Sequence, residues 1–156
     1  MKFLPIENII FKSNLNEDEI IERLTNEVEF ENTYINYVSG KLFDGEIVGN
    51  KFEIIRKIKY RNSCLPKIIG FIEKDTDGTK ITVNMKLHKG ITIFSYIWFG
   101  FLVFMCIMFL STGFYEFHPF TMIIFGYIFI ISSFKYESFK SKKLLKNIFQ
   151  AEIISE

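Results

Sequence analysis

Hydrophobic residues gather most densely in two stretches of the C-terminal half, from Ile91 to Leu110 and from Phe114 to Phe134. The first stretch contains no Asp, Glu, Lys, Arg or His. At about 1.5 Å rise per residue, a helix of this length spans roughly 30 Å, the thickness of the hydrocarbon core of a bilayer. The pattern therefore predicts a transmembrane helical hairpin over residues 90–134, with spans at 90–110 and 114–134.

A soluble protein can also contain continuously apolar helices when a large domain surrounds them. Here the remainder of a 156-residue chain would have to cover two such helices on all sides. That is too little protein to bury the many aromatic side chains of both stretches, so the membrane interpretation is favoured.

Basic residues beside the two stretches predict the orientation. The short link between the spans contains no Lys or Arg, whereas lysines flank the hairpin on both outer sides. Since Lys and Arg are enriched in cytoplasmic loops, both termini are expected in the cytoplasm of an integral membrane protein with two spans. These lysines are Lys80, Lys86 and Lys89 before the hairpin, and Lys135, Lys140, Lys142, Lys143 and Lys146 after it.

The first part of the chain carries strand and helix patterns. Residues Phe3 to Ser13 include a β-branched and aromatic run that is typical of a strand. Asn16 followed by Glu19 is a capping-box pattern, and apolar residues at helical spacing predict a helix from there to about Glu29. Thr33 to Val38 is a further candidate strand.

The next section predicts an antiparallel β-meander. Leu42 to Val48 and Lys51 to Tyr60 flank Gly49 and Asn50, a two-residue link that favours a tight hairpin. Lys67 to Lys74 is the next strand, and Thr79 to His88 alternates strictly between apolar and polar residues. Residues 1–89 are therefore expected to form a cytoplasmic α+β domain, a meander with an N-terminal helix.

Residues 135–156 are expected to form a cytoplasmic amphipathic helix. Leu144, Leu145, Ile148 and Phe149 fall on one side of it, beside an arc of lysines. The apolar side can lie on the membrane surface or pack across the open face of the sheet of residues 1–89. Packing on the sheet is favoured, because a sheet with a single helix would leave core surface uncovered.

Composition and motifs narrow the function. The formal net charge of +1 argues against nucleic acid as a partner, because nucleic-acid binding usually requires a strongly basic face. The chain contains no Gly-rich phosphate loop, nucleophile elbow, CxxC pair or HExxH motif. We therefore predict a non-enzymatic protein with no catalytic residue, no cofactor and no metal site.

Arg56 departs from the pattern of its predicted strand. It shares the apolar face of Phe52 and Ile54, where an unpaired charge would be costly to bury. Arg56 can reach water at the edge of the sheet, or a bulge after Ile55 can shift the register. Alternatively it is an interior anion anchor for a ligand or a buried carboxylate.

One end of the predicted sheet should face the bilayer. Because the strand ending at His88 leads into the first span, the link before the preceding strand must lie at the same end. That link carries positive charge, an amphipathic ring and an apolar tip, which suit a headgroup layer, although a solvated loop would look the same. The candidate contact residues for lipid headgroups or a partner are Lys59, Tyr60, Arg61, Leu65 and Lys67.

These patterns predict a membrane-tethered cytoplasmic binding or regulatory module that contacts anionic lipid headgroups or a protein partner. The alternative is a carrier or sensor of an apolar or anionic small ligand, held in a pocket between the sheet and the C-terminal helix. Small residues in the spans permit close helix contact, but no GxxxG pair specifies a homo-oligomer.

Overall fold

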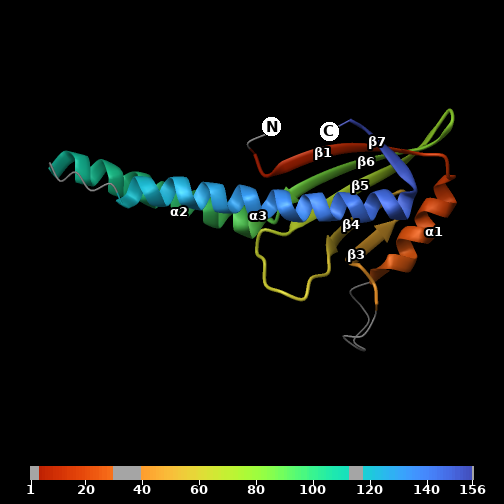
Figure 1. The fold of residues 1–156 in the computed structure, drawn as a ribbon, viewed down its shortest axis with the longest axis horizontal. Helices are drawn as coiled ribbons and strands as arrows, with labels where there is room; N and C mark the ends of the chain where they lie inside the picture. The colour runs from red at the N-terminus through yellow and green to blue at the C-terminus, as the bar shows by residue number, and fades with distance from the viewer. Residues whose placement is uncertain (1–3, 30–39, 113–117, 156) are drawn as a thin grey trace.

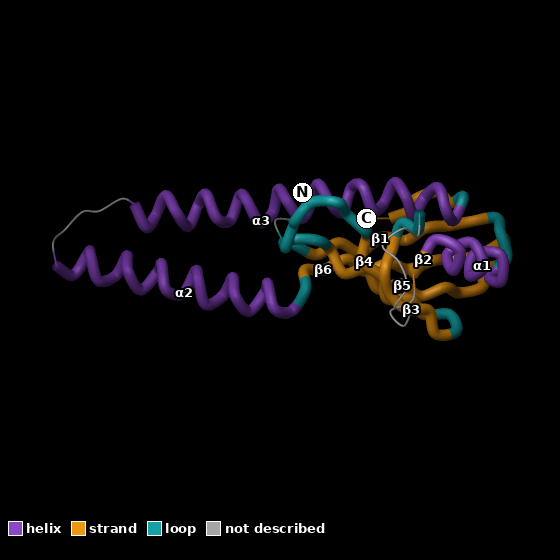
Figure 2. The backbone as a smooth tube through the Cα atoms, turned by 90° about the horizontal axis from the view of Figure 1, so that it is seen from below, coloured by secondary structure: helices purple, strands orange, loops and turns teal. Residues whose placement is uncertain are grey.

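The computed structural model describes residues 4–29, 40–112 and 118–155. These residues form a seven-stranded sheet and three helices in a mixed α+β arrangement. Two long helices project together beyond one end of the sheet, and one of them continues along it (Figure 1). Figure 2 shows the same pair side by side from a perpendicular direction.

The strand order in the sheet is β2-β3-β4-β5-β6-β1-β7. Neighbouring strands are antiparallel except for β2 and β3, which are parallel. The strands are β1 (Ile6–Ser13), β2 (Val28–Glu29), β3 (Phe43–Val48), β4 (Lys51–Arg56), β5 (Pro66–Asp75), β6 (Gly78–Leu87) and β7 (Ala151–Ser155), and the helices are α1 (Glu17–Glu27), α2 (Lys89–Thr112) and α3 (His118–Phe149).

One face of the sheet, called here the inner face, is covered by α1 and the C-terminal half of α3. Alternation places every second residue of β6 on this face, and Ile81, Val83 and Met85 are fully buried there. Phe149 near the end of α3 contacts Phe11 of β1 and Phe52 of β4 through its ring. The second half of α3 therefore packs on the sheet rather than lying apart from it.

The predicted N-terminal helix is confirmed, together with its cap. The Asn16 side chain accepts a hydrogen bond from the backbone N–H of Glu19 at 2.8 Å, and the Glu19 carboxylate accepts one from the Asn16 N–H. This reciprocal capping box satisfies two backbone donors that the first turn of a helix leaves unpaired. Ile20 and Leu24 then enter the core.

The meander prediction is confirmed for β3 to β6, which pair consecutively in antiparallel fashion. Gly49 adopts a φ of 57° in the turn between β3 and β4, a conformation that residues other than Gly resist. The predicted strand from Lys51 to Tyr60 is too long, because β4 ends at Arg56. The pairing of β3 with β4 continues to Arg56 without a shift, so no bulge follows Ile55.

The helices α2 and α3 are both long and apolar enough to cross a membrane, which is a weak indication of membrane location. Gly126 of α3 lies against the ring of Phe99, so the two helices approach closely at this level. The prediction separated a second span from a C-terminal helix, but α3 is one continuous helix of 32 residues. No Pro or Gly follows Gly126 within it to interrupt the backbone hydrogen bonds.

The C-terminal helix was also predicted to run over residues 135–156, and the part after Phe149 is wrong. The helix ends at Phe149, Gln150 adopts a φ of 45°, and β7 then pairs with β1. Ile153 and Ile154 favour an extended strand, and the free edge of β1 supplies the backbone partners that a strand requires.

Some predictions fall outside the described residues. The candidate strand from Thr33 to Val38 lies wholly there, as do Phe3 and the residues 113–117 that include the predicted start of the second span.

Candidate functional site

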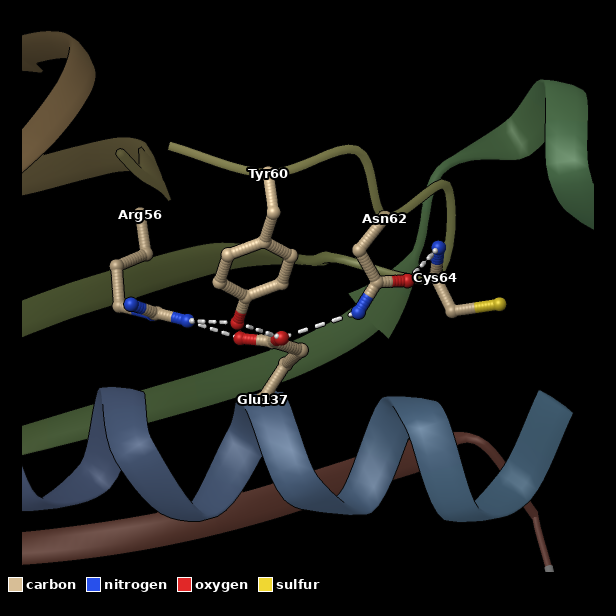
Figure 3. Close-up of polar contacts among 5 residues, drawn as sticks. All are labelled: Arg56, Tyr60, Asn62, Cys64 and Glu137. Carbon is tan, nitrogen blue, oxygen red and sulfur yellow. Dashed lines mark hydrogen bonds and ion pairs between the residues drawn. The ribbon is translucent and has the colours of Figure 1, made fainter. Parts of the chain in front are cut away.

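Four side chains converge where β4 ends and α3 crosses the sheet (Figure 3). The Glu137 carboxylate of α3 forms an ion pair with Arg56 and accepts a hydrogen bond from the Tyr60 hydroxyl. Asn62 Nδ2 donates to the same carboxylate at 3.0 Å, and Arg56 Nη2 donates to the Tyr60 oxygen at 3.3 Å. We call Arg56, Tyr60, Asn62 and Glu137 the carboxylate cluster.

The local sequence explains how these groups meet. Arg56 is the last residue of β4 and lies on the inner face, in line with Phe52 and Ile54. The chain then leaves the sheet, and the loop of residues 57–65 folds back over α3 with Tyr60 and Asn62. The Asn62 Oδ1 accepts from the backbone N–H of Cys64 at 2.9 Å, which fixes the orientation of its amide.

Burial and hydrogen bonding act in opposite directions on the Glu137 carboxyl. Its side chain is 0% exposed, and burial alone raises its pKa. The hydrogen bonds from Tyr60, Arg56 and Asn62 outweigh burial, so the pKa of Glu137 lies below its ordinary value. Burial lowers the pKa of Arg56, but Glu137 and Tyr60 raise it by a larger amount, so this pKa lies above its ordinary value. Arg56 and Glu137 therefore both remain charged.

A second ionic contact lies on the opposite side of α3. Glu7 of β1 faces Lys135 Nζ at 2.5 Å and Lys142 Nζ at 3.0 Å. Burial raises the pKa of Glu7, and the two lysines lower it by a larger amount. The helix is thus held to β1 through its lysines and to the end of β4 through Glu137.

The candidate headgroup residues lie around the end of the sheet from which α2 begins, called here the α2 end. Pro66 of β5 pairs there with Leu87, the last residue of β6. Only His88 separates Leu87 from the start of α2 at Lys89. The loop of residues 57–65 leaves the sheet at this end (Figure 1). The opposite end holds the turn at Gly49 and Asn50, so the loop and this turn are separated by the length of the strands.

Within this group the five predicted residues are in different situations. Lys59, Tyr60 and Arg61 are exposed, whereas Leu65 is half-buried. Lys67 forms an ion pair with Glu53 on the outer face of the sheet. The structure therefore brings Tyr60 into the carboxylate cluster with Arg56, leaves the Lys59 and Arg61 side chains exposed, and directs Lys67 elsewhere.

Lys140 of α3 lies beside two aromatic rings. Its Nζ is 4.2 Å from the ring centroid of Tyr136 and 6.0 Å from that of Tyr60. An ammonium within about 6 Å of a ring is attracted by the negative face of the aromatic system. Tyr60 therefore connects the buried cluster to the half-buried Lys140.

Two observations concern metal ligands and thiol chemistry among the described residues. They contain no group of three His, Cys, Asp or Glu side chains that could hold a metal ion. Burial raises the pKa of Cys64, which makes its thiol less reactive. A shallow depression at the other end of α3 is lined by Lys146, Asn147, Gln150, Ala151 and Glu152, away from the carboxylate cluster.

Five residues of this region were not predicted as site residues from the sequence: Glu7, Asn62, Tyr136, Glu137 and Lys140. A signal for Glu137 was present, because it lies at helical spacing between Phe134 and Ser141, on the side that also carries Leu145. A carboxylate on the buried side of a helix requires a partner, and Arg56 on the buried face of a strand is such a partner.

Comparison of the chain with protein-family models, curated proteins and solved structures finds no match.

Proposed function

We propose that this chain is an integral membrane protein with two spans and a cytoplasmic binding module that contacts anionic lipid headgroups. In this proposal α2 and the first part of α3, up to about Phe134, cross the bilayer, and both termini lie in the cytoplasm. The sheet with α1 and the second half of α3 forms the module.

The observation that carries the proposal is the placement of the exposed side chains of Lys59, Tyr60 and Arg61 at the α2 end of the sheet. The apolar helices leave the sheet at this same end, so a bilayer around them would have its headgroups beside the loop. Near an anionic membrane surface each cation contributes about 1 kcal/mol. Two cations orient a tethered domain without having to anchor it.

The continuity of α3 supports a fixed height for the loop above the bilayer. The same helix contains the apolar segment and the Glu137 carboxylate that holds Arg56, Tyr60 and Asn62. A flexible joint between span and domain would leave the loop free to turn away. Here the span is connected to the loop through a rigid helix and a buried ion pair.

The packing favours this module over a carrier of a small ligand. Arg56, which would hold an anionic ligand, is paired with Glu137. The rings of Phe11, Phe52 and Phe149 occupy the space between the sheet and α3. Both observations place protein side chains where the carrier would need a pocket.

Hydrogen exchange of residues 57–65 tests the proposal. The full chain is reconstituted into vesicles of phosphatidylcholine alone or with phosphatidylglycerol, and we expect slower exchange of the loop in the anionic vesicles. The double variant Lys59→Glu with Arg61→Glu should lose this difference. Lys67 is left unchanged because it is paired with Glu53.

The matched control is Lys51→Glu with Lys74→Glu, which changes the charge equally at two exposed lysines near the opposite end of the sheet. It should retain the lipid-dependent protection. Equal exchange of the unaltered loop in both vesicle types would rule out the headgroup contact.

A further inference from the structure

Three aromatic side chains and a lysine gather on the side of α3 that faces away from the sheet. Phe139 is 68% exposed, Tyr136 57% and Tyr60 48%. The opposite side of the helix carries Ser138 and Ser141, which are fully buried, so the exposed rings contribute little to the packing of α3 on the sheet. We call Tyr60, Tyr136, Phe139 and Lys140 the aromatic patch.

The patch begins where the apolar segment of α3 ends. At about 1.5 Å per residue, Tyr136 lies roughly 3 Å beyond Phe134 along the helix and Phe139 about 7.5 Å beyond it. The polar headgroup layer adds about 5 to 7 Å on each side of the hydrocarbon core. If the core ends near Phe134, Tyr136 falls within the headgroup layer, and the Phe139 backbone lies near its outer edge with its side chain leaning back toward the core.

The Lys140 side chain extends toward the apolar segment of α3. Side chains of an α-helix lean toward its N-terminus, and the N-terminal part of α3 is the apolar segment. The ammonium lies near the Tyr136 and Tyr60 rings, and Tyr60 is held in place by its hydrogen bond to the buried Glu137. The cation is therefore positioned before any ligand arrives, which limits the conformational entropy lost on binding.

We propose that the aromatic patch is an anionic phospholipid site, in which Lys140 binds the lipid phosphate and the Phe139 ring packs within the headgroup layer. The inference rests on the proposed function, since it requires a bilayer around the apolar helices. It adds a second contact, made by α3 itself, to that of the loop. A lipid is favoured as the occupant because the patch continues the surface of α3 directly from its apolar segment.

Depth-dependent fluorescence quenching tests the site. Trp98 is the only tryptophan, so Trp98→Phe with Phe139→Trp gives a chain with one reporter at the patch. In phosphatidylglycerol vesicles, lipids brominated high on the acyl chain should quench this reporter strongly. The matched control is Trp98→Phe with Asn147→Trp, an exposed position about 12 Å further along α3 from residue 139, which should remain unquenched.

The Lys140 contact is tested in the same chain. Lys140→Gln should weaken the preference of the reporter for phosphatidylglycerol over phosphatidylcholine about fivefold, as expected for loss of one cation at an anionic surface. Lys146→Gln, at an exposed lysine further from the apolar segment, should leave that preference unchanged. Hydrogen exchange of residues 57–65 is measured on the same vesicles.

The outcomes separate the two proposals. Equal quenching at positions 139 and 147, or a lipid preference that Lys140→Gln does not alter, would overturn the phospholipid site. If the loop is still protected in anionic vesicles, only the site at α3 fails. If loop protection is also absent, the proposed function fails with it.

Discussion

Arg56 of β4 and Glu137 of α3 are 81 positions apart in the sequence and form an ion pair in which the carboxylate is fully buried. The pair joins the end of a central strand to the helix that continues into the apolar segment. Tyr60 and Asn62 bind the same carboxylate, so the loop at the α2 end is held by the same group. The positions of the strand, the loop and the helix therefore depend on one another.

Removing one partner of this pair should destabilise the domain strongly. The Arg56 side chain is 12% exposed in the parent, so Glu137→Ala removes the counter-charge of a largely buried cation, and we expect a loss of about 3 to 5 kcal/mol in the free energy of unfolding. Denaturant unfolding in detergent, followed by circular dichroism, measures this loss. The double variant Arg56→Met with Glu137→Leu should lose clearly less, because no buried charge is left unpaired. A Glu137→Ala chain as stable as the parent would contradict the assignment.

The pair also predicts how stability depends on pH. The folded pKa of Glu137 lies below the ordinary value of 4.5, so on acidification the unfolded chain takes up this proton before the folded chain does. The stabilisation is present above about pH 4.5 and is lost as the pH falls through the folded pKa. Thermal unfolding should show Glu137→Gln to be less stable than the parent at pH 7, with the difference shrinking below pH 4.5. Some acid sensitivity should remain in the variant, because the pKa of Glu7 is lowered as well.

The aromatic core predicts a contrast between two phenylalanines of α3. Phe149 is 0% exposed and contacts Phe11 and Phe52, so Phe149→Ala should cost about 3 to 5 kcal/mol of unfolding free energy. Phe139 is exposed, and Phe139→Ala should change the stability in detergent by less than about 1 kcal/mol. Similar losses in the two variants would mean that α3 is rotated relative to the sheet.

We expect position 70 in β5 to tolerate no residue larger than Gly. A Cβ atom built there would lie 1.9 Å from the ring of Phe52, a buried residue that cannot move freely. Gly70→Ala should therefore destabilise the domain by about 1 to 3 kcal/mol through overpacking. Gly40→Ala is the control, because among the described residues no atom beyond its chain neighbours lies within 4 Å of its Cβ position. Equal melting temperatures for the two variants would contradict the stacking of Phe52 on Gly70.

Local patterns sufficed to predict much of the fold. Alternation in β6, the capping box at Asn16 and the two-residue turn after Val48 each depend on residues close in sequence, and the structure contains all three. The C-terminal strand could not be found in this way. Ala151 to Ser155 becomes extended because the edge of β1 lies beside it, and that edge is far away in the sequence.

The continuous helix α3 and the carboxylate cluster also could not be predicted from local sequence patterns alone. The sequence marked Arg56 as a charge on a buried face and offered a buried carboxylate as one possible partner. Glu137 was not selected as this partner, although its helical spacing with Phe134 and Ser141 offered a signal, because the C-terminal helix could have packed on the sheet or on the membrane surface. The pairing follows from the tertiary contact between α3 and the end of β4, which no local pattern encodes.

The accessibility of single cysteines on intact cells tests the central claim most directly. In a chain with Cys64→Ser and Cys106→Ala, a cysteine is introduced either as Thr112→Cys at the end of α2 or as Asp77→Cys in the turn between β5 and β6. With both termini in the cytoplasm, a membrane-impermeant maleimide should label position 112 from outside, and position 77 only after the cells are permeabilised. Labelling of position 77 on intact cells with position 112 protected would reverse the orientation, and labelling of neither position before permeabilisation but both afterwards would contradict a membrane-spanning hairpin.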